Sequence, residues 1–251
     1  MEFSWAFYAV AAGAVLVTGV SKSGFAGGLG VMSVPLMTLF VPPSFAVAVF
    51  MPLLVGMDAL IVWRYRKTWD RPAVAALLPG AAIGVAIGAA TFAFMPAALV
   101  TLVVGVLALI FVANFFFRGA PAADGAKPAR RGLALILGAV SGFAGYIAHA
   151  GGPAVKGYLL SRGFDKTTFV GTNSMFFAVM NLMKTGSYAA TGLFTMESLS
   201  LSALLAPLLF VGVGIGLALH RVIDQRVFMK LVYGLLALAG VRLVWDGVAG
   251  F

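Results

Sequence analysis

GFAGGLGVMSVP at residues 24–35 and GFAGYIAHAGGP at residues 142–153 are two versions of one motif. Each opens with Gly-Phe-Ala-Gly and places a proline eleven residues after its first glycine, Pro35 in one and Pro153 in the other. Each lies between apolar segments that are too hydrophobic for a water-soluble fold. The repeated motif therefore predicts a chain built from two copies of one unit, with its function at the glycine-rich segments.

The composition places the chain in a lipid bilayer. Of its 251 residues, 62% are hydrophobic and only 10% are charged, and the mean hydropathy is +1.05. Its apolar runs of about twenty residues match the length of a helix that crosses a bilayer. Strand-type alternation is absent, so we predict an all-α polytopic membrane protein whose backbone groups are satisfied within each helix. We expect a multi-pass protein of the cell inner (plasma) membrane.

Charge and motif content exclude several functions. The net charge is +9, but most basic residues flank the hydrophobic spans, where they set topology rather than bind nucleic acid. The chain has no cysteine, which excludes disulfides and thiolate metal sites. P-loop, GxSxG, HExxH and paired-carboxylate motifs are also missing, so we predict no enzyme activity, no cofactor and no metal. The expected partners are a small anion and the lipid bilayer, and homo-oligomerisation is left open.

The two copies align element by element. The equivalent residue of Asp58 is Asn181, which predicts that the two form a pair near the pseudo-twofold axis. The offset between copies grows along the chain, so the insertions fall in loops. The predicted units are a first membrane repeat over residues 1–118, a cytoplasmic linker over 119–131 and a second repeat over 132–251, together one transport domain. The predicted elements are a broken hairpin over 3–41 with spans over 44–63, 73–94 and 97–117, and a second hairpin over 133–160 with spans over 168–190, 198–219 and 227–245.

Loop charges predict that the copies are inverted. RYRKTWDR at residues 64–71 is strongly basic, whereas the matching loop of the second copy, TGLFTME at residues 191–197, has no lysine or arginine. The uncharged loops of the first copy likewise match SRGFDK at residues 161–166 and HRVIDQR at residues 220–226. Basic loops stay in the cytoplasm, so matching loops should face opposite sides of the membrane. We predict inverted-topology repeats, each a broken or re-entrant hairpin plus three spans, with both termini outside.

The broken hairpins predict a cavity. Breaking a helix in lipid frees backbone groups, and this is tolerated only where they face protein, water or a ligand. Helix N-termini that begin at such breaks would favour an anion. Close helix packing is the alternative, and it is the preferred interpretation for Gly84, Gly88, Gly212 and Gly216. The glycines assigned to the substrate site are Gly24, Gly27, Gly28, Gly151 and Gly152.

Buried charges indicate what the cavity binds. Lys22 stands beside the first motif and Lys184 lies deep within a predicted span, and charges inside a membrane normally face a cavity. Lys156 could instead extend to the membrane surface. Because Asp58 is the one acid placed with certainty inside a span, the local balance is positive and favours an anion. Asp58 could couple transport to protons or merely neutralise a lysine, and both roles stay open.

Uncharged polar residues complete the candidate site. His149 could hydrogen-bond a substrate oxygen or shuttle a proton, and a structural histidine bonded to the backbone is about as plausible. Thr172 and Asn173 place a hydroxyl and an amide at the start of a span, where they suit oxyanion recognition. A helix N-cap explains them equally well.

The two motifs, followed by FAVAVFMP at residues 45–52 and FVGTNSMFF at residues 169–177, resemble the TauE/SafE sulfite exporter family, also called the 4-toluene sulfonate uptake permease family. The resemblance covers nearly the whole chain. It implies movement of sulfite, thiosulfate, sulfonates or other small organic anions, outward in some members and inward in others. The first copy lacks the family's glycine triplet and its Gly-Thr-Asn or Gly-Thr-Ser, which the second copy keeps as Gly-Thr-Asn. We therefore expect the substrate contacts to lean on the second copy.

The sequence thus predicts a secondary transporter of a small sulfur-containing anion that works by alternating access. Sulfite, thiosulfate or an organosulfonate would be held between the two hairpins. Three alternatives remain at this stage: a passive anion channel, a transporter of a small organic carboxylate, and a membrane subunit that serves a soluble enzyme.

Overall fold

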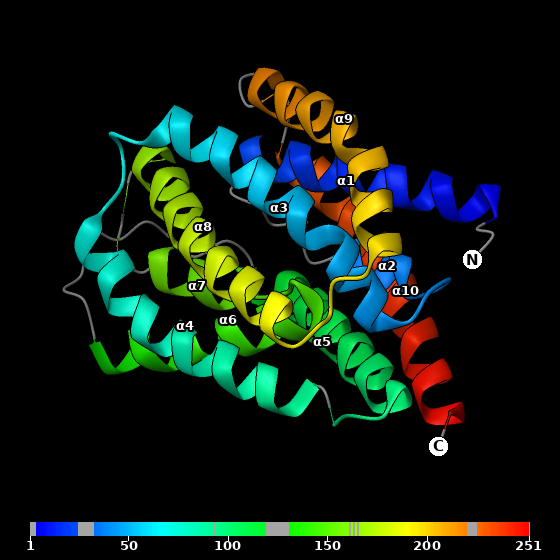
Figure 1. Cartoon of the computed structure of the whole chain (residues 1–251). Coiled ribbons are helices and arrows are strands. Elements are labelled where there is room, and N and C mark those ends of the chain that lie inside the picture. The colour runs from blue at the N-terminus through cyan, green and yellow to red at the C-terminus, as the bar shows by residue number, and fades with distance from the viewer. Residues whose placement is uncertain are drawn as a thin grey trace.

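A computed structural model of the chain describes residues 4–24, 33–92, 94–118, 131–160, 162, 164, 166–219 and 225–250. These residues form ten α-helices and no strand, which confirms the all-α prediction (Figure 1). The helices are α1 (Trp5–Gly24), α2 (Ser33–Met37), α3 (Pro43–Tyr65), α4 (Arg71–Phe92), α5 (Ala97–Arg118), α6 (Arg131–Ala148), α7 (Gly152–Leu160), α8 (Lys166–Ala190), α9 (Met196–Leu219) and α10 (Gln225–Ala249).

Five of these helices are long and apolar enough to cross a membrane: α1, α3, α4, α6 and α9, with 18 to 24 residues each. At a rise of about 1.5 Å per residue, twenty residues cover the hydrocarbon core of a bilayer. The multi-pass prediction is therefore confirmed. The other predicted spans form α5, α8 and α10. Helix α8 is 25 residues long but is not among the five, since Asn173, Asn181 and Lys184 lower its hydropathy.

The second motif breaks a helical hairpin, as predicted. Helix α6 ends at Ala148, α7 begins at Gly152, and the two helices pack against each other. In the first copy α1 packs against α2, which ends at Met37, so the second arm expected up to residue 41 is not helical beyond that residue. The Thr38 hydroxyl bonds to backbone carbonyls of the preceding turn, and two prolines follow at residues 42–43, which ends the helix. Residues 25–32, the tip of this hairpin, lie outside the described residues.

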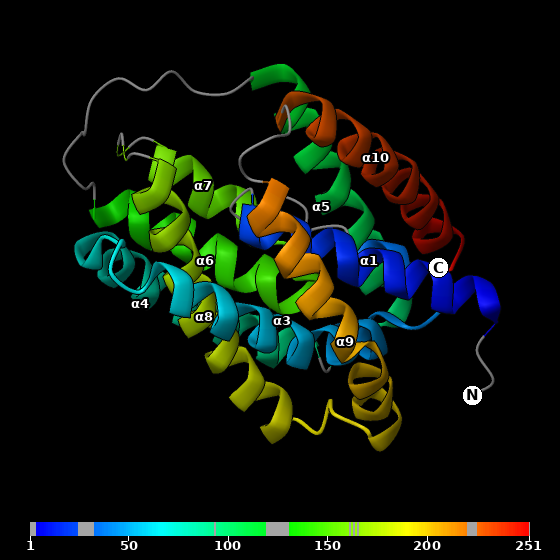
Figure 2. The same ribbon diagram turned by 90° about the horizontal axis from the view of Figure 1, so that it is seen from above.

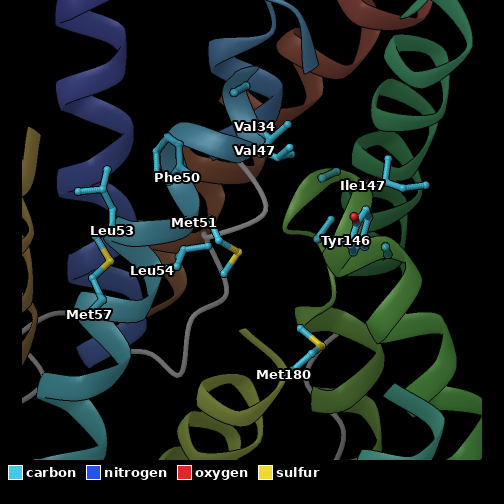
Figure 3. Packing of buried hydrophobic residues seen from close by; sticks show 14 of the residues in the cluster. Val34, Val47, Phe50, Met51, Leu53, Leu54, Met57, Tyr146, Ile147 and Met180 are labelled. Carbon is cyan, nitrogen blue, oxygen red and sulfur yellow. The ribbon is translucent and has the colours of Figure 1, made fainter. Parts of the chain in front are cut away.

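Helix α3 runs through the centre of the molecule. Residues 46–51 are all buried, so α3 is covered on every side along this stretch, and it packs against both α8 and α9. Around it, α1 packs on α9, α4 packs on α6, and α5 packs on α10 (Figures 1 and 2). Figure 3 shows part of the apolar core, with Met51 and Leu54 of α3 on one side and Tyr146 and Ile147 of α6 on the other. This core encloses the polar residues described below.

Glycines let the outer helix pairs touch backbone to backbone. A Cβ atom added to Gly212 of α9 would lie 2.8 Å from the carbonyl oxygen of Leu16 in α1, and one added to Gly88 of α4 would lie 2.8 Å from Cβ of Tyr146 in α6. Gly84 and Gly216 are closer still, since an added Cβ atom would collide with the Ala139 carbonyl oxygen and with the Ser23 hydroxyl oxygen, respectively. The prediction that these four glycines serve helix packing is confirmed.

The two ends of the described chain lie at the same end of the molecule in both views (Figures 1 and 2). The basic loop 64–71, which includes the end of α3 and the first residue of α4, packs against the start of α8. The loops around residues 42–44, 95 and 191–193 line a common cavity of about 340 Å³. Uncharged loops of both copies are thus gathered in one place.

Candidate functional site

An ion pair and a hydrogen bond to it connect three helices in the protein interior. The Nζ atom of Lys22 in α1 lies 2.6 Å from Oδ1 of Asp58 in α3, and Nδ2 of Asn181 in α8 donates a 2.6 Å hydrogen bond to Oδ2. Only 2% of Asp58 is exposed. Both carboxylate oxygens are engaged, which offsets the cost of burying the charge. The predicted pairing of Asp58 with its equivalent Asn181 is confirmed, and the carboxylate neutralises Lys22.

A second polar group surrounds Lys184 of α8. Its Nζ atom donates a 2.8 Å hydrogen bond to the Gly145 carbonyl and lies 2.8 Å from Nδ1 of His149. On the other side of the ring, Nε2 of His149 lies 3.0 Å from the Val47 carbonyl oxygen. A carbonyl can only accept, so Nε2 carries a hydrogen. When the imidazole is neutral, Nδ1 accepts from Lys184. The imidazole thus bridges α3 and α8.

His149 occupies the break between α6 and α7 in an unusual backbone conformation. Its φ angle is 52°, in the left-handed region where helices commonly end on glycine. The next amide, that of Ala150, folds back to donate a 3.1 Å hydrogen bond to the Ala144 carbonyl. A side chain in this region costs conformational energy, and the bonds to Lys184 and Val47 hold it there. The break thus places an imidazole at the centre of the site.

The two groups face one cavity of about 30 Å³. This volume is enough for roughly two water molecules. Apolar walls come from Leu54, Phe177 and Met180. The polar residues that line the cavity are Lys22, His149, Asn173, Ser174, Asn181 and Lys184.

The lysines differ in whether a carboxylate balances their charge. Lys22 is paired with Asp58, whereas Lys184, only 1% exposed, contacts neutral acceptors, and the described residues include no ion pair to it. Lys156 of α7 is half-buried and does not line the cavity. Any positive charge on Lys184 therefore lacks a counter-ion within the described part of the chain.

Neighbouring residues on α8 have different environments. Thr172 is buried, but its Oγ1 accepts a 2.8 Å hydrogen bond from the Asp70 amide in the basic loop, so it holds that loop rather than facing the cavity. Asn173 is the next residue, about 100° further around the helix, and it lines the cavity with Ser174. The structure brings Asn173 to the site and leaves Thr172 outside it.

The glycines predicted to form the substrate site also lie in different environments. Gly152 lines the cavity. Gly151 lies against Ser141, where an added Cβ atom would come 2.5 Å from Oγ, so it permits the close approach of α6 and α7. An added Cβ on Gly24 would lie 2.6 Å from the Gly216 carbonyl oxygen, which places Gly24 in the contact between α1 and α9. Gly27 and Gly28 lie outside the described residues.

Sequence reasoning missed the backbone acceptors. The carbonyl groups of Gly145 and Val47 hold Lys184 and His149, and neither type of group has a sequence signature. Pro52 within α3 lacks the amide that would bond to the Ala48 carbonyl, and the carbonyls on either side of Ala48 are the ones that accept from other helices. Val47 accepts from His149, and Val49 accepts from Ser202 at 2.7 Å.

The fold and the site define a multi-pass helical membrane protein with a buried polar cavity and a lysine that has no counter-ion among the described residues. The chain matches the sulfite exporter TauE/SafE family over residues 11–243. This match covers nearly the whole chain, and the protein belongs to the TauE/SafE sulfite exporter family of membrane transporters. A search of curated proteins found no match, and a search of solved structures found none.

Proposed function

We propose that the protein is a secondary transporter of a small sulfur-containing anion, namely sulfite, thiosulfate or an organosulfonate. The observation that carries this proposal is the environment of Lys184, which is buried beside the second hairpin and has only neutral acceptors among the described residues. An anion in the cavity would be the counter-ion that these residues do not supply. The family to which the chain belongs supports a sulfur anion.

The cavity offers donors that suit an oxyanion. Lys184 supplies an N–H group, and the amide and hydroxyl groups of Asn173 and Ser174 lie on the same wall. Hydrogen bonds to a charged oxygen are the stronger ones, so these groups would orient as well as hold the ligand. Leu54, Phe177 and Met180 would contact an apolar substituent. Most of these groups come from the second half, in keeping with the expectation from the sequence.

Binding requires the site to widen. The cavity of about 30 Å³ holds roughly two water molecules, whereas sulfite has four non-hydrogen atoms. Tyr146 lines the larger cavity of about 340 Å³, and its carbonyl accepts a hydrogen bond from the Tyr188 hydroxyl. The Tyr188 ring in turn lies 6.3 Å from the ring of His149, which lines the smaller cavity. In the basic loop, the Asp70 amide donates a hydrogen bond to the Thr172 hydroxyl, and Oδ1 of Asp70 lies 3.9 Å from Nη2 of Arg162. These features support alternating access from a closed state.

Helix packing supports the inverted repeat. Exchanging the two halves converts the α1–α9 contact into the α6–α4 contact, and it leaves the α3–α8 and α5–α10 contacts unchanged. The basic loop of the first half packs at the start of α8, while uncharged loops of both halves share the larger cavity. We propose that residues 1–118 and 132–251 are the two repeats of one transport domain. The protein would lie in the inner membrane of the cell, with linker 119–131 in the cytoplasm.

Transport by the purified protein tests the function. Proteoliposomes would be given labelled sulfite, thiosulfate, an alkanesulfonate or a small carboxylate, with Lys184→Met compared with Lys156→Met. We expect saturable uptake of a sulfur anion and counterflow, loss of uptake in Lys184→Met, and retained uptake in Lys156→Met, whose lysine lies outside the cavity. Equal uptake by Lys184→Met and the parent chain would overturn the proposal. Uptake without saturation or counterflow would indicate a channel, and uptake of carboxylates alone would reject the sulfur anion.

A further inference from the structure

We propose that the anion moves together with one proton, that this proton binds at the Lys184–His149 pair, and that the preferred anion is singly charged. The inference rests on the proposed transport function and adds to it the coupling ion, its site and the charge of the substrate. It differs from the alternative in which Asp58 carries the proton.

The hydrogen bonds of the pair leave one position on Lys184 without a protein acceptor among the described contacts. Two N–H groups of Lys184 are used by the Gly145 carbonyl and by Nδ1 of His149, and the N–H of His149 is used by Val47. A neutral amine has two N–H groups and one lone pair, so these contacts satisfy it fully. The remaining position belongs to the lone pair, or to the third N–H group of the ammonium, and Lys184 lines the cavity.

Charge balance favours the neutral amine when the site is empty. The charges around the pair are Lys22 on α1 and Asp58 on α3, which cancel, while Asn173 and Asn181 on α8 are uncharged and Tyr188 packs 6.3 Å from the His149 ring. An ammonium at Lys184 would leave one net positive charge inside the membrane, which is costly. Empty, the site is therefore neutral.

The loading step follows from this balance. A proton adds to the lone pair of the Lys184 amine, which becomes an ammonium, and the third N–H group donates to an oxygen of the anion. No other bond forms or breaks. With a singly charged anion the loaded site is again neutral, so both states that must reorient across the membrane avoid a net buried charge. A doubly charged anion would leave one negative charge, so sulfonates and hydrogensulfite should be carried better than thiosulfate.

Asp58 is less suited to this role. Both of its oxygens are occupied, one by Lys22 and one by Asn181, at 2.6 Å each. Protonation of the carboxyl would leave Lys22 as a buried charge without its partner. His149 instead positions the acceptor: its left-handed backbone and its bond to Val47 fix the ring so that Nδ1 faces Lys184.

Proton uptake on binding tests the inference. Methanesulfonate is a suitable probe because it is a singly charged anion that does not itself titrate near neutral pH. Purified protein in weakly buffered detergent solution would be mixed with it beside a pH indicator dye. We expect one proton taken up per anion bound. Lys184→Arg should bind the anion without proton uptake, because guanidinium keeps its proton.

His149→Asn is the matched variant. Asparagine tolerates the left-handed backbone, and its Oδ1 can accept from Lys184, but its side chain does not titrate. We expect this variant to retain proton uptake, which separates a proton on Lys184 from one on the imidazole. Proton uptake that persists in Lys184→Arg, or that is lost in Asp58→Asn alone, would overturn the proposal.

A measurement on the unaltered protein guards against variants that do not fold. In proteoliposomes, movement of one proton with one methanesulfonate is electroneutral, so its rate should not respond to an imposed membrane potential, and internal pyranine should report acidification. A rate that follows the potential would overturn the coupling. Transport of methanesulfonate without proton movement would reject this inference alone, whereas failure to transport any sulfur anion would reject the proposed function.

Discussion

Asn181 donates a 2.6 Å hydrogen bond to Asp58, and in the proposed repeat these two residues hold equivalent positions. Equivalent residues of a duplicated protein can touch only near the axis that relates the halves. The contact therefore marks the place where α3 and α8 cross as the centre of the molecule. The lysines of the site, Lys22 and Lys184, line the cavity beside this point.

The Lys22–Asp58 ion pair at this centre predicts that substitutions of the two residues do not have additive effects on stability. Asp58→Asn leaves Lys22 buried without a counter-ion, and breaking a buried pair from one side costs about 3–5 kcal/mol. The double variant Lys22→Met/Asp58→Asn should recover much of this loss. Thermal unfolding in detergent of the two single variants and the double variant checks the prediction. Additive losses in the double variant would show that the pair does not couple the two residues.

The contact between α1 and α9 predicts a sharp difference between two glycines on one helix. A Cβ atom at Gly216 would collide with the Ser23 hydroxyl and the Val20 carbonyl, whereas Gly214 has nothing within 4 Å. Gly216→Ala should destabilise the protein by about 1–3 kcal/mol through overpacking. Gly214→Ala is the control and should be neutral or slightly stabilising. Similar melting temperatures for both variants would contradict this packing.

The left-handed backbone of His149 predicts an unusual order of stabilities. His149→Ala and His149→Gly both remove the bonds to Lys184 and Val47, but glycine adopts a φ of 52° without strain. We expect His149→Gly to be more stable than His149→Ala by about 1 kcal/mol. Chemical or thermal unfolding would measure the difference. A more stable alanine variant would mean that position 149 does not keep this conformation.

The proposed topology predicts labelling from opposite sides. The chain has no native cysteine, so single-cysteine variants report without background. Arg66→Cys in the basic loop should react only with permeant maleimides in whole cells, and Thr195→Cys in the matching loop of the second half should also react with impermeant ones. Labelling of both positions from the same side would contradict the inverted repeat.

Much of the fold follows from sequence because hydrophobic length and glycine spacing are local properties. The helix break in the second motif, the packing role of Gly216 and the Asp58–Asn181 pair were all predicted from residue patterns. The different environments of Thr172, which bonds to the basic loop, and Asn173, which lines the cavity, were not predicted. They depend on which face of α8 meets the loop at Asp70, a tertiary contact without a local signal. The backbone carbonyls that hold Lys184 and His149 were hidden for the same reason.

The division of buried charges between the halves has a consequence for how the chain enters the membrane. Lys22 and its counter-ion Asp58 both belong to the first half, and Lys184 and its acceptors on Gly145 and His149 all belong to the second. Each half therefore holds the partners of its own buried lysine. During synthesis the first five helices can insert with their charge already satisfied, before the ribosome has made the rest. Assembly of the halves then adds the hydrogen bonds that cross between them, from Asn181 to Asp58 and from His149 to Val47.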